Sequence, residues 1–368
     1  MEQNTNRLLW AVGILAIGAL LLGGGSVLAK ENFLPKISQA FEKMLEDKNN
    51  VKSVEEADGY IVAKIRDEDK TKNESAIYIF LTKNEDGTLT IDHARNDGKL
   101  TADHEIYMEG EGPLTGSTGD LYIPDQVDGL DITKIGEGAF GYADFSGKLR
   151  LPSKLKEIGR GSFSGSKFTG ELVLPENMKS IGDYAFSGSN FTGNLNLPQN
   201  VEYIGKSAFR LSTFTGELNL PQNIEYIGYT AFQSSTFTGT FESRSNLKTI
   251  EDRAFEESNF TGDFKGFDSL EEIGTSAFKD STFNGTFVTP SSLKKIGEWA
   301  FYHSTFTGTL DLFNISTIEN WAFDSSLFTQ VNNPRNLHSV SLFHDEEENL
   351  IGYNAIHLST GTYYFNYN

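Results

Sequence analysis

The chain has 368 residues, with 51 acidic side chains against 31 basic ones, and it contains no cysteine. A formal net charge of −20 disfavours nucleic acid and anionic lipid head groups as partners. The absence of cysteine excludes disulfides, thiolate metal ligands and cysteine nucleophiles, so packing has to stabilise the fold.

The amino-terminal part of the chain predicts export from the cytoplasm. Residues 1–7 form a short polar start, and residues 8–29 follow without a charged side chain. A helix over these 22 residues would measure about 33 Å, which is enough to cross a bilayer. The segment is either a retained transmembrane helix with its amino terminus inside the cell or a secretory signal cleaved near Ala29. We expect retention, because the whole apolar stretch spans without a charge.

The apolar helix is predicted to continue as an amphipathic helix, or stalk, over residues 30–50. Phe33, Ile37 and Phe41 recur every four residues, which places them on one helix face. A short polar leader, an apolar helix, an amphipathic helix and a β-rich head also resemble the organisation of pilins. The side chains predicted to contact lipid or other copies of the chain are Leu8, Trp10, Ile14, Ile17, Leu21, Phe33, Ile37 and Phe41.

Residues 51–118 are predicted to form an acidic, β-rich element. The segments Tyr60–Ile65, Ala76–Leu81 and Thr88–Ile91 are rich in β-branched and aromatic side chains and predict three strands. Asn84–Gly87 predicts a hairpin turn between the last two strands. We expect this element to cap the repeats that follow, because the terminal unit of a repeat stack needs a polar outer face.

Residues 119–340 repeat with a period of 23 residues. One phenylalanine column consists of Phe140, Phe163, Phe186, Phe209, Phe232, Phe255, Phe278, Phe301 and Phe323, and the other of Phe145, Phe168, Phe191, Phe214, Phe237, Phe260, Phe283, Phe306 and Phe328. So short a repeat cannot bury its own apolar side chains, so successive units must stack and each column becomes a ladder in a shared core. Leu-x-Leu pairs such as Leu195 and Leu197 alternate with period two, and we expect each to add one strand to a parallel ladder.

The repeat motif is similar to that of a known family. Leu151-Pro152 followed by Leu155, Ile158-Gly159 and Phe163 resembles the BspA-type leucine-rich repeat of microbial surface proteins. The resemblance implies a right-handed, mainly β solenoid of about nine coils, here preceded by the amino-terminal helix and the small β-rich cap. It also implies an extracellular binding or adhesion module without catalytic residues.

Residues 341–368 are predicted to be a degenerate carboxy-terminal cap, because Ile351-Gly352 copies part of the repeat core. His344 stands beside the acidic run 345–348, which we interpret as a solvated loop, because metal ligands normally converge from spaced positions. The other histidines share no metal-binding spacing and no serine and aspartate partners. The sequence therefore predicts no catalytic residue, no metal site, no cofactor and no enzymatic activity.

Partner binding is expected to use outward side chains that vary from coil to coil. Tyr203 and Tyr226 occupy the same position in neighbouring coils and form the best exposed aromatic pair for a partner. In the alternative interpretation, their packing only stabilises the sheet. The polar candidates on the outward face of the Leu-x-Leu segments are Glu171, Asn194, Asn196, Glu217 and Asn219.

These features predict a non-enzymatic, membrane-tethered surface protein of a microbe, whose solenoid binds an extracellular protein or glycan. The alternative function is a pilin-like subunit of a surface filament, which assembles through its hydrophobic helix and displays the repeats outside. The two functions differ in whether residues 8–45 pack against lipid or against copies of themselves. Nucleic acid is expected as a partner in neither case.

Overall fold

The computed structural model describes residues 51–57, 59–67, 75–96, 114–237, 241–242, 246–260, 263–282, 285–306, 309–312, 314–319, 321–323, 330–333 and 361–364. The chain divides into two compact units, Met1–Asn49 and Asn50–Asn368. The predicted membrane helix and the predicted amphipathic helix lie outside the described residues and stay predictions. Within the described part of the chain, no helix is long and apolar enough to cross a bilayer.

An antiparallel sheet precedes the repeats. Its strands are β1 (Ser53–Ala57), β2 (Tyr60–Arg66), β3 (Ile77–Lys83) and β4 (Leu89–Arg95), and each pairs with the next. The three predicted strands are confirmed as β2, β3 and β4. The predicted hairpin turn is also confirmed, because the amide of Gly87 donates to the carbonyl of Asn84 at 3.0 Å. Gly87 has a φ of 80°, a left-handed conformation that favours glycine.

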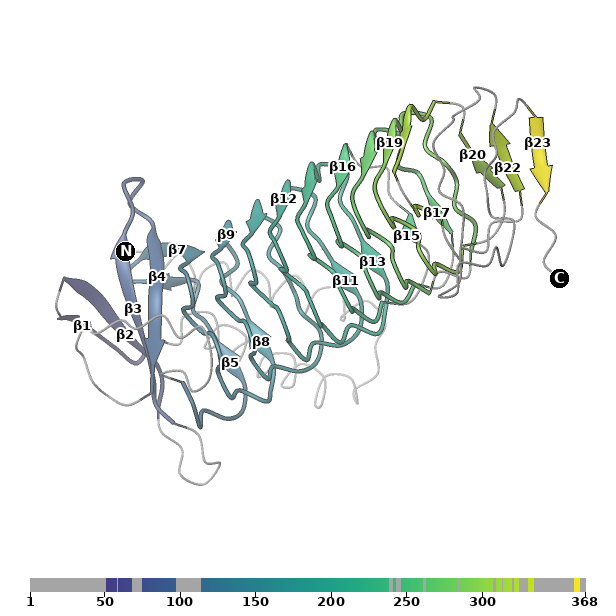
Figure 1. Cartoon of the computed structure of the whole chain (residues 1–368). Coiled ribbons are helices and arrows are strands. Elements are labelled where there is room, and N and C mark those ends of the chain that lie inside the picture. The colour runs from purple at the N-terminus through teal and green to yellow at the C-terminus, as the bar shows by residue number, and fades with distance from the viewer. Residues whose placement is uncertain are drawn as a thin grey trace, which may run out of the picture. The chain divides into compact units, whose positions relative to one another are not determined.

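A long parallel ladder begins where β4 pairs with β7 (Leu130–Ile135), beside the short antiparallel partner β6 (Gln126–Val127) (Figure 1). From β7 the ladder continues through one strand of each coil. These strands are β9 (Glu157–Ile158), β10 (Ser180–Ile181), β12 (Tyr203–Ile204), β14 (Tyr226–Ile227), β16 (Thr249–Ile250), β18 (Glu272–Ile273), β19 (Lys295–Ile296) and β21 (Thr317–Ile318). Each ends on a buried isoleucine, so the ladder carries an isoleucine column into the core.

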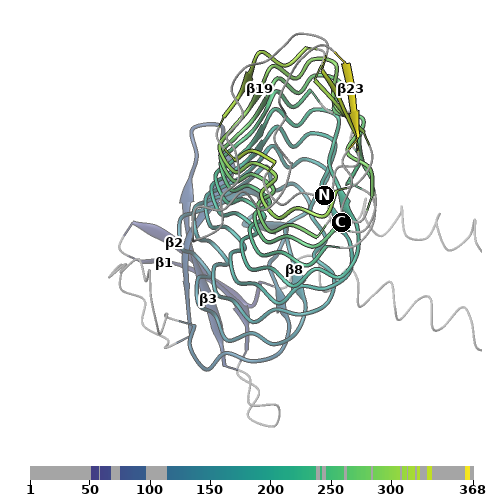
Figure 2. The same cartoon turned by 45° about the vertical axis from the view of Figure 1, so that its right-hand side comes forward.

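The Leu-x-Leu segments form separate, smaller sheets on the other side of the coils (Figures 1 and 2). The pairs are β5 (Leu121–Tyr122) with β8 (Leu149–Arg150), β11 (Leu195–Asn196) with β13 (Leu218–Asn219), β15 (Phe241–Glu242) with β17 (Phe264–Lys265), and β20 (Thr309–Asp311) with β22 (Gln330–Asn333), which also pairs with β23 (Gly361–Tyr364). The Leu-x-Leu segment at residues 172–174 forms no strand, although the same coil contributes β10 to the isoleucine ladder.

The continuous ladder therefore does not run through the Leu-x-Leu segments, where we expected it, but through the segments that precede the Ile-Gly glycines. The reason is backbone proximity. A Cβ atom on Gly228 would lie 2.8 Å from the carbonyl carbon of Gly205 in the preceding coil. Glycine, which most coils have at this position, lets the backbones of successive coils approach closely.

Two columns of stacked phenylalanines fill the interior of the solenoid. From Phe140 to Phe323, ring centroids of successive coils lie 5.2–5.5 Å apart and the rings are within 11° of parallel. The second column meets the first edge-on, as Phe237 does with Phe232 at 5.7 Å and 72°. Both predicted ladders are confirmed wherever their rings are described; Phe283 and Phe328 lie outside the described residues.

The predicted fold class, a mainly β leucine-rich-repeat solenoid, is confirmed. The solenoid has about seven turns, slightly fewer than the nine predicted coils. The difference arises at the ends, because β7 already belongs to the junction with the antiparallel sheet, and the coil of β21 is described only in part.

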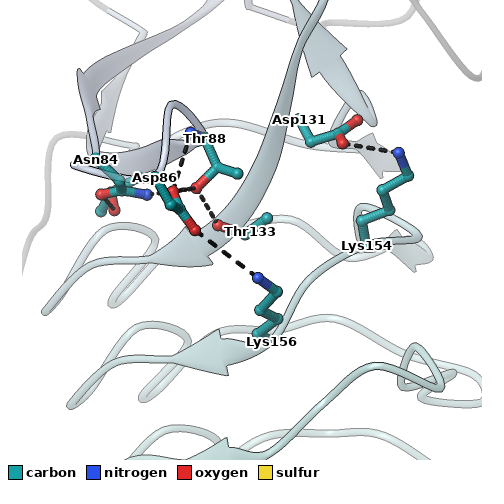
Figure 3. A network of polar contacts seen from close by, with 8 residues as sticks. Asn84, Asp86, Thr88, Asp131, Thr133, Lys154 and Lys156 are labelled. Atoms are coloured by element: carbon teal, nitrogen blue, oxygen red, sulfur yellow. Dashed lines mark hydrogen bonds and ion pairs between the residues drawn. The ribbon is translucent and has the colours of Figure 1, made fainter.

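Polar side chains join the β3–β4 hairpin to the first coils (Figure 3). The hydroxyl of Thr88 lies 2.8 Å from that of Thr133 on β7. The carboxylate of Asp86 accepts from that Thr88 hydroxyl at 2.6 Å and lies 3.9 Å from the ammonium of Lys156. The hydrogen bonds from Thr88 lower the pKa of Asp86, with a smaller contribution from the charge of Lys156. The hairpin is therefore joined to the array by side chains as well as by the ladder.

Candidate binding surfaces

Tyr203 and Tyr226 form a stacked pair on the isoleucine ladder. They are paired residues of β12 and β14, and their ring centroids lie 5.0 Å apart at an interplanar angle of 5°. Each precedes a buried isoleucine, so strand alternation turns the tyrosine outward. Tyr203 is 40% exposed, and Tyr226 is half-buried. The structure thus brings this predicted pair together as expected.

The surroundings of the tyrosine pair are acidic. Burial raises the pKa of Tyr203, and the carboxylate of Asp183 adds to the effect. Burial also raises the pKa of Tyr226, followed by the charge of Glu251. Glu251 follows Ile250 where most coils have glycine, and burial raises its pKa, with Asp252 contributing further. Both phenols therefore stay neutral around pH 7 and offer hydrogen-bond donors next to carboxylates.

The predicted asparagines bind the coils to one another. The side-chain amide of Asn219 donates to the side-chain oxygen of Asn196 at 2.8 Å, across the β11–β13 pair. The side-chain oxygen of Asn194 accepts from the backbone amide of Glu217 at 2.9 Å. All four side chains are exposed, as is that of Glu171 one coil earlier. These asparagines therefore have a structural role, and only their remaining polar atoms are open to a partner.

The predicted binding residues do not form one site. Tyr203 and Tyr226 lie on the isoleucine ladder, whereas Asn196 and Asn219 lie on a separate two-stranded sheet. Figure 1 shows β12 and β11 on different sides of the coil. The solenoid thus presents two distinct candidate faces, one aromatic and one made of amides and carboxylates.

A third column of equivalent positions was not predicted from the sequence, and its members range from buried, as Ser276 is, to exposed, as Trp299 and Trp321 are. The second residue before each phenylalanine of the first column has a left-handed backbone, with φ between 51° and 65°. Its members are Gly138, Gly161, Tyr184, Ser207, Thr230, Arg253, Ser276, Trp299 and Trp321. Because most of these residues are not glycine, the sequence does not indicate their left-handed backbone conformation. The available signal was that two of the three tryptophans, Trp299 and Trp321, share one repeat position.

The geometry of the described residues offers no candidate metal centre. No group of three His, Asp or Glu side chains could hold a metal ion among the residues that the structure covers. The acidic run beside His344 lies outside them. The expectation of no metal, cofactor or catalytic residue stays a prediction for the whole chain.

The repeat region matches a family model. The BspA type leucine rich repeat region is found in six copies over residues 133–261 and 249–350, more than half of the chain. The chain belongs to this family. The BspA-type repeats account for the residues that form the isoleucine ladder and the phenylalanine columns. The match does not reach the first 132 residues, so the predicted anchor receives no support from it.

Several solved structures of leucine-rich repeat proteins are similar to this BspA-type chain. One, from Bacteroides ovatus, is 19% identical with a TM-score of 0.30, and the match covers 70% of this chain and 89% of that one. The pneumococcal vaccine antigen PcpA is 15% identical with a TM-score of 0.34, covering 78% and 84%. A leucine-rich cell surface protein from Faecalibacterium prausnitzii is 16% identical with a TM-score of 0.26, covering 74% and 86%. No curated protein is similar enough to count as a match.

Proposed function

We propose that this chain is a cell-surface protein whose solenoid binds a protein or glycan partner outside the cell, in adhesion or recognition. Membership of the BspA-type family supports the surface location, because proteins with this repeat are typically surface-associated. In this proposal residues 8–29 tether the chain to the membrane, with the amino terminus inside. The chain acts by binding and not by catalysis.

The observation that carries the binding proposal is the tyrosine pair. The equivalent positions on neighbouring strands hold Ser180 and Thr249, so the fold does not require an aromatic ring there. An exposed tyrosine on a rigid strand presents a large amphipathic surface with few rotatable bonds, and tyrosine is enriched among residues that dominate binding energy. Tyr203 and Tyr226 thus give the solenoid a pre-formed contact surface.

The proposal predicts that the double variant Tyr203→Ser, Tyr226→Ser loses partner binding while staying folded. Serine is tolerated at this position, because Ser180 pairs with Tyr203 in the same ladder. Loss of a dominant aromatic contact should weaken binding on the order of 30-fold. The measurement is binding of the purified full chain to immobilised extracellular-matrix proteins and oligosaccharides, by surface plasmon resonance.

The exposed Glu217→Ala variant is the matched control, because it changes the face on the other sheet. It should bind as the unchanged chain does. Equal binding by the unchanged chain and the double tyrosine variant would refute the proposal that the two tyrosines contact the partner. Filaments that contain the chain on cells, with no binding to any partner, would favour the pilin-like alternative.

A further inference from the structure

A second aromatic cluster lies in the coils of β19 and β21, far along the ladder from the tyrosine pair. Trp299 and Trp321 occupy the same left-handed position in successive coils, with φ of 54° and 53°. Their ring centroids are 5.7 Å apart at an interplanar angle of 18°. Together with Tyr302 and Lys279 they line a surface hollow of about 340 Å³. That volume lies within the range of small-molecule sites.

The fold does not need tryptophan at these two positions. Gly161, Ser207 and Ser276 occupy the same column with the same backbone conformation. A bulky side chain is disfavoured at positive φ, and Trp299 and Trp321 are nevertheless left 36% and 37% exposed. A residue that is costly for the backbone and left partly in water points to a role outside folding.

The tryptophan stack ends at Trp299. Trp299 stacks on Trp321 in the next coil, whereas Ser276 holds the same column position in the preceding coil and is almost fully buried. The column therefore offers Trp299 no further aromatic ring to stack on. Lys279 and Tyr302 line the hollow beside the two indole rings.

The charges around the hollow disfavour an anionic ligand, and Lys279 already occupies the cation position over the Tyr302 ring. The ammonium of Lys279 already lies 5.9 Å from the centroid of the Tyr302 ring, where a ligand cation would bind. The same ammonium lies 3.8 Å from a carboxylate oxygen of Glu256 and 3.6 Å from one of Asp280. Its charge is thus offset by two carboxylates, in a chain of net charge −20. A neutral ligand fits this balance.

We infer that the Trp299–Trp321 hollow binds a neutral sugar ring of a glycan. The apolar C–H face of a pyranose matches a flat indole face, and its hydroxyls at the ring edge match the ammonium of Lys279 and the phenol of Tyr302. A hollow of about 340 Å³ holds one or two sugar rings. This inference rests on the proposed function and assigns the glycan to this part of the solenoid, separate from the tyrosine face.

Tryptophan fluorescence tests the inference directly, because the chain has only Trp10 besides these two tryptophans. Full-length protein is titrated with neutral oligosaccharides of glucose, galactose, mannose or N-acetylglucosamine, and with sialylated and sulfated ones. The neutral oligosaccharides should bind and thereby shift the tryptophan emission. Trp299→Ser should weaken that binding on the order of tenfold or more. Serine suits the position, as Ser207 and Ser276 show, so the melting temperature should stay close to that of the unchanged chain.

Tyr229→Ser is the matched control, because Tyr229 is an equally exposed aromatic in another coil and does not line the hollow. It should bind neutral sugars normally. The inference is overturned if no neutral oligosaccharide binds, if only charged ones bind, or if Trp299→Ser binds them unchanged. It is also overturned if Trp299→Ser loses a protein partner instead. In each of these cases partner binding that depends on Tyr203 and Tyr226 would leave the proposed function standing.

Discussion

Replacing Phe232 with alanine should lower the free energy of unfolding by about 3–5 kcal/mol, which is the range for removing a fully buried aromatic ring. Phe232 is completely buried and stacks between Phe209 and Phe255, at 5.4 Å and 5.2 Å. The cavity would be shared by three coils, so neighbouring coils should open together with the altered one. Urea unfolding followed by circular dichroism, with hydrogen exchange of individual coils, measures both effects.

Two further variants distinguish the loss of buried volume in the core from the effect of a substitution as such. Phe232→Leu retains most of the buried volume and should cost clearly less than alanine. Glu217→Ala, on an exposed side chain, should change stability by roughly half a kcal/mol or less. An unfolding curve for Phe232→Ala that overlays that of the unchanged chain would show that the phenylalanine column does not support the core.

Deleting one whole period should be tolerated, whereas deleting a few residues more should not. Removal of residues 205–227 joins Ile204 to Gly228 and restores the motif, so every downstream column keeps its register. Removal of residues 205–232 also takes the Gly-Tyr-Thr-Ala-Phe segment, and the junction coil loses a buried phenylalanine worth about 3–5 kcal/mol. That coil would also lack the residues needed to return to the ladder.

The two deletions are compared by urea unfolding with Trp299 and Trp321 as reporters of the carboxy-terminal coils. The 23-residue deletion should unfold cooperatively with a slightly smaller dependence on urea, because it buries less surface. In the longer deletion, those coils should unfold at a much lower urea concentration. Equal stability of the two deletions would mean that the 23-residue register does not control the stack.

The sequence predicted the core of this fold because periodicity reports stacking directly. Phenylalanines 23 residues apart can meet only if successive coils lie one above another, and the rings of Phe140 and Phe163 do so at 5.3 Å. The strands before the repeats were also predictable, since β2, β3 and β4 are rich in β-branched and aromatic residues and a turn at Gly87 lies between β3 and β4. In both cases a local pattern and its packing agree.

Other features depend on contacts between coils that one repeat does not reveal. The residues before Ile-Gly, such as Tyr203 and Tyr226, were interpreted only as outward side chains, but their segments form the continuous ladder. The asparagines predicted to bind a partner turned out to bond across coils, because equal residues at a 23-residue spacing are direct neighbours. The tryptophan hollow could not be predicted, because it depends on a left-handed backbone that residues such as Ser, Arg and Trp do not indicate.

The most direct test of the central proposal is the exposure of the repeats on intact cells. Cells that produce the full chain are treated with a membrane-impermeant, amine-reactive biotin reagent, and the modified lysines are identified by mass spectrometry. Lys156, Lys179 and Lys206 are exposed on three successive coils and should be modified without lysis, while an abundant cytosolic protein is not. Modification of these lysines only after the cells are lysed would contradict the account of a surface-displayed binding solenoid.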